Sequence, residues 1–236
     1  MDKVVLDQEK LVTGDPVVAA RREWGYLPPE ERFGVGVLGL HEGATLLVSL
    51  RQSQLCRVTA LCDQDRGKLE HAATICPDAW ATERYEEMLQ REDVQIVAIY
   101  TPDPLHAEHI DAAFRAGKHV ICTKPLISDR SAIPDILRES QRSGCRLLVG
   151  QSTRFGEPFR RQREMYEAGA FGEVEVLDTH YNHEMAWFYE KSPWAIRDTH
   201  WAYLGLSHPI DLVRWYLGPI QEVHAYGTIT EVGRSF

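Results

Sequence analysis

Cysteine is scarce in this chain, and its cysteines match no common disulfide or metal framework. The five cysteines among 236 residues are odd in number, and no two of them form a Cys-x-x-Cys pair. Small disulfide-stapled domains carry an even set, and cysteine-based zinc sites are built from Cys-x-x-Cys pairs. The sequence therefore predicts neither feature, and we expect a protein of the reducing cytoplasm.

The chain also lacks long apolar segments and an excess of positive charge. It has no run of about 18 apolar residues, the length that a membrane-spanning helix needs. Asp2, Lys3 and Asp7 fall where a signal peptide would be apolar. With 35 acidic and 26 basic residues, the net charge of −9 gives no general attraction to a phosphate backbone. We therefore expect neither a membrane nor a nucleic acid as partner.

Between Gly34 and Gly150, short apolar runs alternate with segments of helical period. Parallel strands need a crossover between them, and helices of this length provide it. The pattern therefore predicts an α/β domain with a doubly wound parallel sheet of the Rossmann type. We expect strands at 34–39, 57–62, 79–82, 94–100, 119–122 and 146–150, and helices at 44–51, 65–74, 85–90, 104–117 and 131–142.

The regions on either side of this domain differ from it. Residues 1–32 are polar and without a sustained period, which predicts an N-terminal extension. After the domain at 33–150, the alternation stops, and 151–236 reads as a partial α+β substrate or oligomerisation domain. We expect helices at 158–168 and 209–217 and strands at 173–182 and 220–230. Two strands alone would leave long edges exposed, so a homo-oligomer is expected.

The turn after the first strand is a candidate phosphate-binding loop. A literal Gly-x-Gly-x-x-Gly begins at Gly34, but its first two glycines lie inside the apolar run. The turn more plausibly begins at Gly39, in the run Gly39-Leu40-His41-Glu42-Gly43-Ala44. His41 then stands where a glycine would let the backbone approach a pyrophosphate, and Glu42 adds an anion. Alone, the loop fits a dinucleotide turn and an ordinary strand-to-helix turn equally well.

Asp63 strengthens the nucleotide interpretation. It ends the second strand, 24 residues after Gly39, and an acid at about 20 residues from the loop contacts the adenosine ribose in dinucleotide-binding domains. A carboxylate there accepts from both ribose hydroxyls and repels a 2′-phosphate, which favours NAD over NADP. The alternative is that Asp63 is a turn or cap residue before the next helix.

Further motifs follow in a characteristic order. They are Ile99-Tyr100-Thr101-Pro102 with His106, Gly117-Lys118-His119-Val120-Ile121-Cys122-Thr123-Lys124-Pro125, Gly150-Gln151-Ser152-Thr153-Arg154-Phe155, and Gly172-Glu173-Val174. From Gly34 to the C-terminus the chain resembles the Gfo/Idh/MocA family of sugar and polyol oxidoreductases. With the loop and Asp63, the resemblance implies NAD contacts at Gly39, His41, Glu42, Asp63, Thr101, Pro102, His106, Thr123 and Lys124.

The resemblance also implies a catalytic pair, Lys124 and His208. The Glu-Lys-Pro motif of that family appears here as Thr123-Lys124-Pro125, and the implied role of Lys124 is to orient substrate beside the nicotinamide. The segment Gly205-Leu206-Ser207-His208-Pro209-Ile210-Asp211 is similar to the part of the family that carries the histidine. Leu204 occupies the place of an aspartate four residues earlier, so the acid has no counterpart. Family members are longer, so we expect a substrate domain that is incomplete relative to the family.

The residue types fit alcohol oxidation, which needs a hydride acceptor, a base for the hydroxyl proton and a cation near the developing alkoxide. Pro209 suits the first helical position, which makes His208 the N-cap, where the helix dipole disfavours imidazolium. A neutral imidazole is what a general base requires. We interpret Asp211 as a carboxylate that caps the free N–H groups of the same turn.

Three other groups of side chains could suggest a site. His180 and His183 are three apart on a predicted strand and face opposite sides, so no metal site is predicted. A set of aromatic residues could stack on a sugar or pack a core or subunit interface: Tyr181, Trp187, Phe188, Tyr189, Trp194 and Trp201. A cluster of arginines is interpreted as a solvated helix face: Arg154, Arg160, Arg161 and Arg163.

The sequence therefore predicts an NAD-dependent oxidoreductase that transfers a hydride between nicotinamide and a hydroxyl-bearing carbon of a sugar, polyol or related small molecule. Two alternatives stay open. One is an enzyme that retains NAD and achieves a net non-redox change, such as an epimerase, dehydratase or glycosidase. The other is a non-catalytic NAD-binding protein, motivated by His41 and Leu204.

Overall fold

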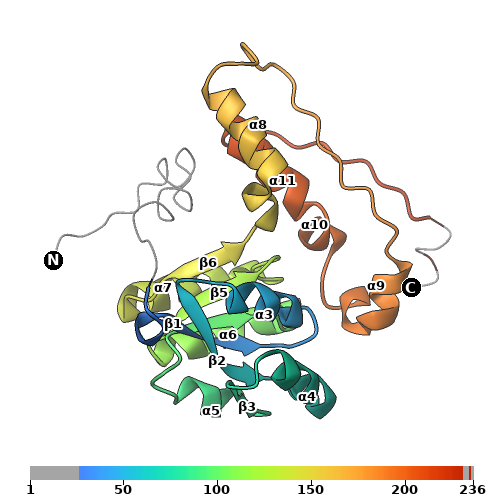
Figure 1. Ribbon diagram of the computed structural model, residues 1–236. Helices are drawn as coiled ribbons and strands as arrows, with labels where there is room; N and C mark the ends of the chain where they lie inside the picture. Colours follow the sequence, from blue (N-terminus) through green and yellow to red (C-terminus); the bar gives the residue numbers. More distant parts are fainter. Residues whose placement is uncertain (1–26, 231–233, 235–236) are drawn as a thin grey trace.

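The computed structural model describes residues 27–230 and 234, and its first part is built on a six-stranded parallel sheet (Figure 1). The strand order is β3-β2-β1-β4-β5-β6, so the direction of winding reverses between β1 and β4. Ligands of open α/β sheets bind at such a reversal, beyond the carboxyl ends of the strands. The strands are β1 (Phe33–Leu38), β2 (Cys56–Cys62), β3 (Trp80–Thr82), β4 (Ile96–Ile99), β5 (His119–Thr123) and β6 (Leu147–Gly150).

Helices cover both faces of this sheet, and each face has its own apolar core. Val35 and Val37 of β1 pack on one face with residues of α3 and α4, whereas Val97 and Ile99 of β4 pack on the other with residues of α5, α6 and α7. Burial on both faces explains why the strands read as nearly continuous apolar runs. The predicted Rossmann fold is confirmed. The helices are α3 (Gly43–Arg51), α4 (Arg66–Ile75), α5 (Tyr85–Leu89), α6 (His106–Arg115) and α7 (Ile133–Ser143).

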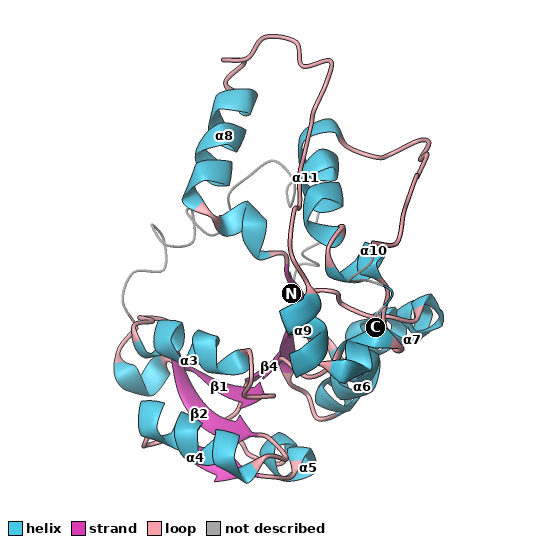
Figure 2. Cartoon of the chain, turned by 90° about the vertical axis from the view of Figure 1, so that its right-hand side faces the viewer, coloured by secondary structure: helices cyan, strands magenta, loops and turns pink. Residues whose placement is uncertain are grey.

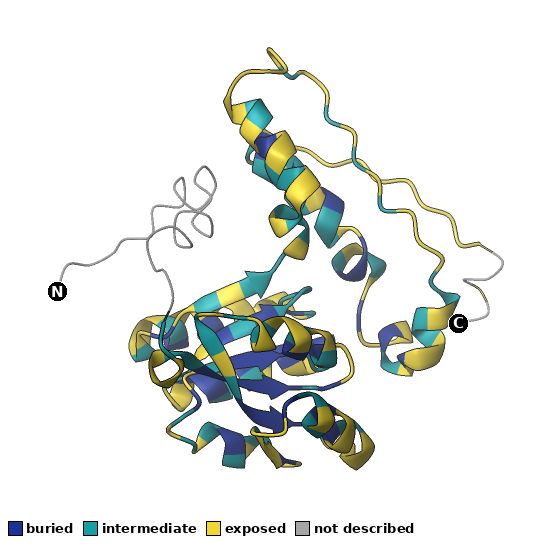
Figure 3. Ribbon diagram, in the orientation of Figure 1, coloured by how far each residue is buried: buried dark blue, intermediate teal, exposed yellow. Residues whose placement is uncertain are grey.

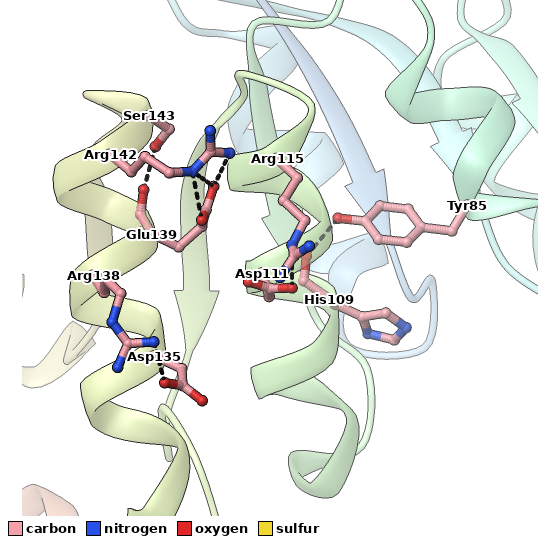
Figure 4. Close-up of polar contacts among 9 residues, drawn as sticks. All are labelled: Tyr85, His109, Asp111, Arg115, Asp135, Arg138, Glu139, Arg142 and Ser143. Carbon is pink, nitrogen blue, oxygen red and sulfur yellow. Dashed lines mark hydrogen bonds and ion pairs between the residues drawn. The ribbon is translucent and has the colours of Figure 1, made fainter.

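Figure 4 shows one polar contact between α5 and α6 and others within α7. The Tyr85 hydroxyl of α5 donates to the main-chain oxygen of His109 in α6, at 2.9 Å. On α7, the Arg142 guanidinium donates to both carboxylate oxygens of Glu139, at 3.0 and 2.9 Å from its Nε. Helix α6 is preceded by a 3-10 turn, η2 (Asp103–Leu105), which begins directly after the Thr101-Pro102 motif. The predicted helix at 104–117 is therefore two elements.

The region after β6 is helical, and its two long helices pack against each other. The Tyr216 hydroxyl of α11 donates to Gln162 of α8 at 3.2 Å, and its ring lies edge-on to Tyr166 at 5.3 Å. Arg163 of α8 is 8% exposed and donates to the main-chain oxygen of Trp215, so its predicted place on a solvated face is wrong. The elements are η4 (Ser152–Phe155), α8 (Glu157–Glu167), α9 (Ala186–Lys191), η5 (Pro193–Ile196), α10 (Trp201–Leu204) and α11 (Ser207–Leu217).

The two strands predicted in this region, 173–182 and 220–230, do not form. Both segments are loops, and Figure 2 shows that the drawn strands are confined to the first domain. Much of these loops is exposed, as Figure 3 shows, with Val176 at 82% and Tyr226 at 98%. An alternating pattern favours an extended backbone, but a strand also needs a neighbour for its N–H and C=O groups. Within the described residues, neither segment has such a neighbour.

Most of the predicted N-terminal extension, residues 1–26, lies outside the described residues. Its last part begins with Leu27, whose N–H donates to the main-chain oxygen of Gln54 at 3.3 Å. A 3-10 turn, η1 (Pro29–Glu31), then leads into β1. Across the described part of the chain, no helix combines the length and the apolar character needed to cross a bilayer. The division of the chain at about residue 150 stays a prediction.

Candidate functional site

A cavity of about 1280 Å³ lies at the carboxyl ends of the strands, between the sheet and the helices that follow it. It is larger than the ~300–1,000 Å³ of ordinary small-molecule pockets, so it has room for a dinucleotide together with a small substrate. Residues from both parts of the chain line it. The predicted site residues on its wall are Gly39, His41, Glu42, Asp63, Thr101, Pro102, Thr123, Lys124 and His208.

The turn after β1 needs glycine at Gly39. Its φ of +85° is in the left-handed region, and a Cβ there would lie 2.7 Å from the carbonyl carbon and oxygen of Tyr100. The Gly39 N–H donates to the main-chain oxygen of Cys62 at 2.9 Å. The turn is thus held against the ends of both neighbouring strands, which places the start of α3 at the cavity.

His41 and Glu42 lie at the edge of the cavity, and neither is packed away. Their side chains are 53% and 67% exposed, with His41 Nε2 at 3.7 Å from Glu42 Oε1. Glu42 is the N-cap residue of α3, yet its side chain makes no capping hydrogen bond. The first N–H groups of a helix and the positive end of its dipole attract anions. The loop therefore fits a pyrophosphate, with His41 free to turn toward solvent.

Asp63 braces the same turn. Its Oδ2 accepts from the Leu40 N–H at 2.7 Å, and its Oδ1 accepts from the Asp65 N–H at 2.8 Å. The N-cap of α4 is Asp65, whose Oδ1 accepts from Gly67 and Lys68, so the alternative that Asp63 caps this helix is wrong. Its other form, that Asp63 is a turn residue, is confirmed by the hydrogen bond from the Asp65 N–H, two residues on. A carboxylate oxygen has two lone pairs, and each oxygen of Asp63 keeps one for a further donor on the cavity wall.

Thr101 is fixed by two histidines of α6. His109 Nδ1 lies 3.0 Å from the Thr101 hydroxyl, and burial lowers the pKa of His109. His106 is completely buried, with Nε2 at 2.8 Å from the main-chain oxygen of Thr101 and Nδ1 at 2.8 Å from that of Pro125. His106 is not among the residues that line the cavity, and its contact with the cofactor stays a prediction. His106 ties the segment after β4 to the loop after β5.

Lys124 follows β5, lines the cavity and is half-buried. Its Nζ donates to the main-chain oxygen of Leu204 at 2.7 Å. Burial lowers the pKa of Lys124, while the carboxylates of Asp103 and Glu42 raise it. Leu204, which lacks the carboxylate expected at its position, thus contributes a carbonyl oxygen to the lysine.

His208 shares the cavity wall with Lys124. Its Nδ1 lies 3.0 Å from the Thr153 hydroxyl, and its ring stacks on Tyr181 at 5.3 Å. Burial lowers the pKa of His208, the charge of Lys124 lowers it further, and Asp211 raises it. The neutral imidazole that the sequence predicts is therefore favoured, but by burial and the lysine charge rather than by the helix dipole. Helix α11 begins at Ser207 with Leu206 as N-cap, so the prediction that His208 is the N-cap is wrong.

Asp211 does not cap its helix either. Its carboxylate accepts two hydrogen bonds from Arg154, at 2.6 Å from Nε and 2.7 Å from Nη2. This pair is largely buried, which also corrects the prediction of a solvated Arg154. The bidentate contact fastens η4 to α11 and so aligns Thr153 with His208.

Aromatic rings line part of the cavity. Tyr181 stacks on His208 and, at 5.7 Å, on His183, which in turn lies 6.0 Å from Trp187. Of the six aromatic residues singled out in the sequence, Tyr189 is the one absent from the cavity wall; the five on it are Tyr181, Trp187, Phe188, Trp194 and Trp201. No group of three or more metal-ligating side chains occurs in the described residues.

Two family profiles match this chain. The profile described as "Oxidoreductase family, NAD-binding Rossmann fold" matches residues 33–151, and that of the "GFO/IDH/MocA C-terminal domain" matches residues 159–234. The chain belongs to the Gfo/Idh/MocA family. The resemblance inferred from its motifs is therefore confirmed, and with it the assignment to oxidoreductases with an NAD-binding Rossmann domain.

Relatives within the family include inositol 2-dehydrogenase of Salmonella paratyphi B, 29% identical over 167 residues, which are 68% of this chain and 46% of the relative. The 1-carboxy-3-chloro-3,4-dihydroxycyclohexa-1,5-diene dehydrogenase of Comamonas testosteroni is 30% identical over 144 residues, 61% of this chain and 36% of the relative. The chain thus spans less than half the length of these relatives. Scyllo-inositol dehydrogenase from Lactobacillus casei, solved with NAD(H) and scyllo-inositol, shares the fold, with a TM-score of 0.71 at 22% identity over 79% of this chain and 56% of that one.

One buried acid on the cavity wall was missed at the sequence level. Asp103 is 5% exposed, and its Oδ2 accepts from the Thr199 hydroxyl at 3.0 Å. Its only sequence signal is its place directly after the family's Thr101-Pro102 motif. An acid before a helix reads as a cap, so the pattern gave no reason to place it inside the protein.

Proposed function

We propose that the protein transfers a hydride between NAD and a hydroxyl-bearing carbon of a sugar, polyol or related small molecule. One observation carries the proposal. Lys124 and His208, far apart in sequence, lie on one cavity wall, close enough for the lysine charge to lower the pKa of the imidazole. A cation beside a neutral base is the pair that alcohol oxidation requires.

The residues at the carboxyl ends of β1 and β2 fit the cofactor. The Gly39 turn and the first N–H groups of α3 would hold the pyrophosphate, and Asp63 would accept from the adenosine ribose. We propose NAD rather than NADP, because the Asp63 carboxylate would repel a 2′-phosphate. Thr101, Pro102 and Thr123 would line the path to the reaction centre. When bound, the nicotinamide supplies the hydride acceptor or donor.

Lys124 and His208 would divide the remaining work. An ammonium has three N–H donors, and the carbonyl oxygen of Leu204 uses one of those on Lys124. The other two can hold the substrate oxygen and steady its developing negative charge. The Nδ1 atom of His208 is engaged with Thr153, so Nε2 is the atom that would take up the hydroxyl proton.

The aromatic wall supports a ring-shaped substrate. Trp187 and Trp201 contribute flat aromatic faces to the lining of the cavity that also contains His208. Such faces pack well against the C–H groups of a sugar or cyclitol ring and keep water away from the reaction centre. Substrate hydroxyls would then point toward Lys124.

Turnover tests the proposal most simply. A panel of sugars, cyclitols and polyols would be screened by the absorbance of reduced nicotinamide. We expect at least one substrate to be oxidised, and Lys124→Ala and His208→Ala to reduce kcat/KM by a factor of about 10² or more. Arg138→Ala, at an exposed position of α7, is the control and should retain activity. NAD binding without turnover on any alcohol would contradict the proposal.

Leu204 favours a second candidate, an enzyme that keeps NAD bound and carries out a net non-redox reaction. Without the carboxylate at this position, the released proton would have a poorer exit, and return of the hydride to the same substrate would compete with its release. Bound NAD, product formation and no net absorbance of reduced nicotinamide would support this candidate.

We also propose that the protein assembles as a homo-oligomer in the cytoplasm. Among the described residues, the segments 173–182 and 220–229 belong to no sheet. A second copy could pair with them by strand addition. Light scattering that gives the mass of a single chain would contradict the oligomer.

A further inference from the structure

Asp103 is an acid in an unusual position for a charged group. It begins η2 at the carboxyl end of β4, it lines the cavity, and it is 5% exposed. Carboxylates are rarely buried this far without compensating partners. The other buried acid of the described residues, Glu139, is paired with Arg142 of the same helix, α7. Asp103 instead faces the proposed reaction centre.

The orientation of Asp103 is set from the other part of the chain. Thr199, 7% exposed in the segment between η5 and α10, donates its hydroxyl to Asp103 Oδ2 at 3.0 Å. The Lys124 ammonium is likewise held by Leu204, at the end of α10. Two contacts from one short stretch of chain therefore fix both the carboxylate and the lysine.

Asp103 and Lys124 influence each other's charge. Burial lowers the pKa of Lys124, and the Asp103 carboxylate opposes this effect. Burial raises the pKa of Asp103, which the Thr199 hydrogen bond and then His106 and Lys124 oppose. Other titratable groups lie near the pair: Cys122 of β5 is near Asp103, and Glu42 and His208 are near Lys124. Of the two carboxylates that raise the pKa of Lys124, Asp103 therefore has the larger effect.

We propose that Asp103 is a positioning residue for Lys124: its carboxylate, oriented by Thr199, keeps the half-buried lysine as the ammonium that holds the substrate oxygen. The role of the lysine in this statement rests on the proposed function. Asp103 would thus supply, from the end of β4, the negative charge that is missing at Leu204. Asp103 acts through Lys124 and needs no contact with substrate.

The test is a titration of Lys124 that requires neither cofactor nor substrate. The full chain would be labelled with ¹³C at lysine Cε, and the Lys124 signal would be identified by its loss in Lys124→Met. In Asp103→Asn, whose amide oxygen can still accept from Thr199, we expect Lys124 to lose its proton at lower pH than in the wild type. Asp111→Asn, on α6 and paired with Arg115, is the charge-matched control and should leave Lys124 unchanged.

A reciprocal titration covers the case in which Asp103→Asn does not fold. With ¹³C at aspartate Cγ, the Asp103 signal should titrate at higher pH in Lys124→Met than in the wild type, because the favourable positive charge is gone. A Lys124 signal that titrates identically in wild type and folded Asp103→Asn would overturn the proposal. So would an Asp103 signal that is unchanged in Lys124→Met.

These outcomes are separable from failure of the proposed function. If the chain turns over an alcohol, Asp103→Asn should move the alkaline limb of the kcat/KM profile to lower pH and leave NAD affinity unchanged. If no alcohol is oxidised, the two titrations still decide whether Asp103 sets the charge of Lys124.

Discussion

Replacing Gly39 with alanine should destabilise the Rossmann domain and weaken NAD binding together. Gly39 has a φ of +85°, in the left-handed region that costs an L-residue about 1–2 kcal/mol. The new Cβ would also lie 2.7 Å from the carbonyl carbon and oxygen of Tyr100. Relief of that overlap moves β1 away from β4, and forced overpacking costs about 1–3 kcal/mol. We expect a total loss of about 2–5 kcal/mol in the free energy of unfolding.

Gly144→Ala is the matched control. Gly144 has a φ of +71°, but a Cβ there would meet nothing within 4 Å, so only the conformational cost of about 1–2 kcal/mol applies. Urea unfolding followed by circular dichroism compares the two variants, and calorimetry gives their NAD affinities. If Gly39→Ala costs no more than Gly144→Ala, or binds NAD as well, the close approach of the turn to β4 does not shape the site.

Three further predictions concern His208, Asp63 and the Arg154–Asp211 pair. Burial and the Lys124 charge lower the pKa of His208 below its ordinary 6.5, so the imidazole stays neutral to lower pH. The acid limb of the kcat/KM profile should therefore have its midpoint below pH 6.5. A midpoint above pH 6.5 would contradict the assignment of His208 as the base. Asp63→Ser should raise the ratio of NADP to NAD affinity about tenfold, which is ~1.4 kcal/mol, and competitive titration should detect it. Arg154→Met should lower the free energy of unfolding by about 1.5–3 kcal/mol, and adding Asp211→Asn to that variant should lower it little further. A double-mutant cycle that shows no coupling between the two residues would exclude this ion pair as a contact that holds α11.

The Rossmann part could be predicted from the sequence because its signals are local. Apolar runs gave the strands, the period of the intervening segments gave the helices, and Gly39 marked the turn that only glycine can make. The family motifs then placed Lys124 and His208 in one site. Both line the same cavity in the structure, although neither residue has a catalytic signal without the resemblance.

The errors share one physical cause, since each depends on a distant part of the chain. Segment 173–182 has the alternation of a strand, but pairing requires a neighbour that no local pattern reports. Asp211 was interpreted by its place in a helix turn, whereas Arg154, far away in sequence, binds it. Asp103 and Arg163 carry charges that predict exposure, and only the packed structure shows what they contact.

The start of α11 is an error of a different, local kind. The proline pattern predicts Pro209 as the first helical residue, but the helix begins two residues earlier, at Ser207. The expected neutral imidazole of His208 follows instead from its burial, to which Tyr181 and Thr153 contribute contacts.

Calorimetric titration of NAD into the full chain tests the central claim most directly, because the cavity at the ends of β1, β2, β4 and β5 is proposed to hold that dinucleotide. We predict saturable binding with one NAD per chain. The absence of saturable heat at any NAD concentration would contradict the proposed function.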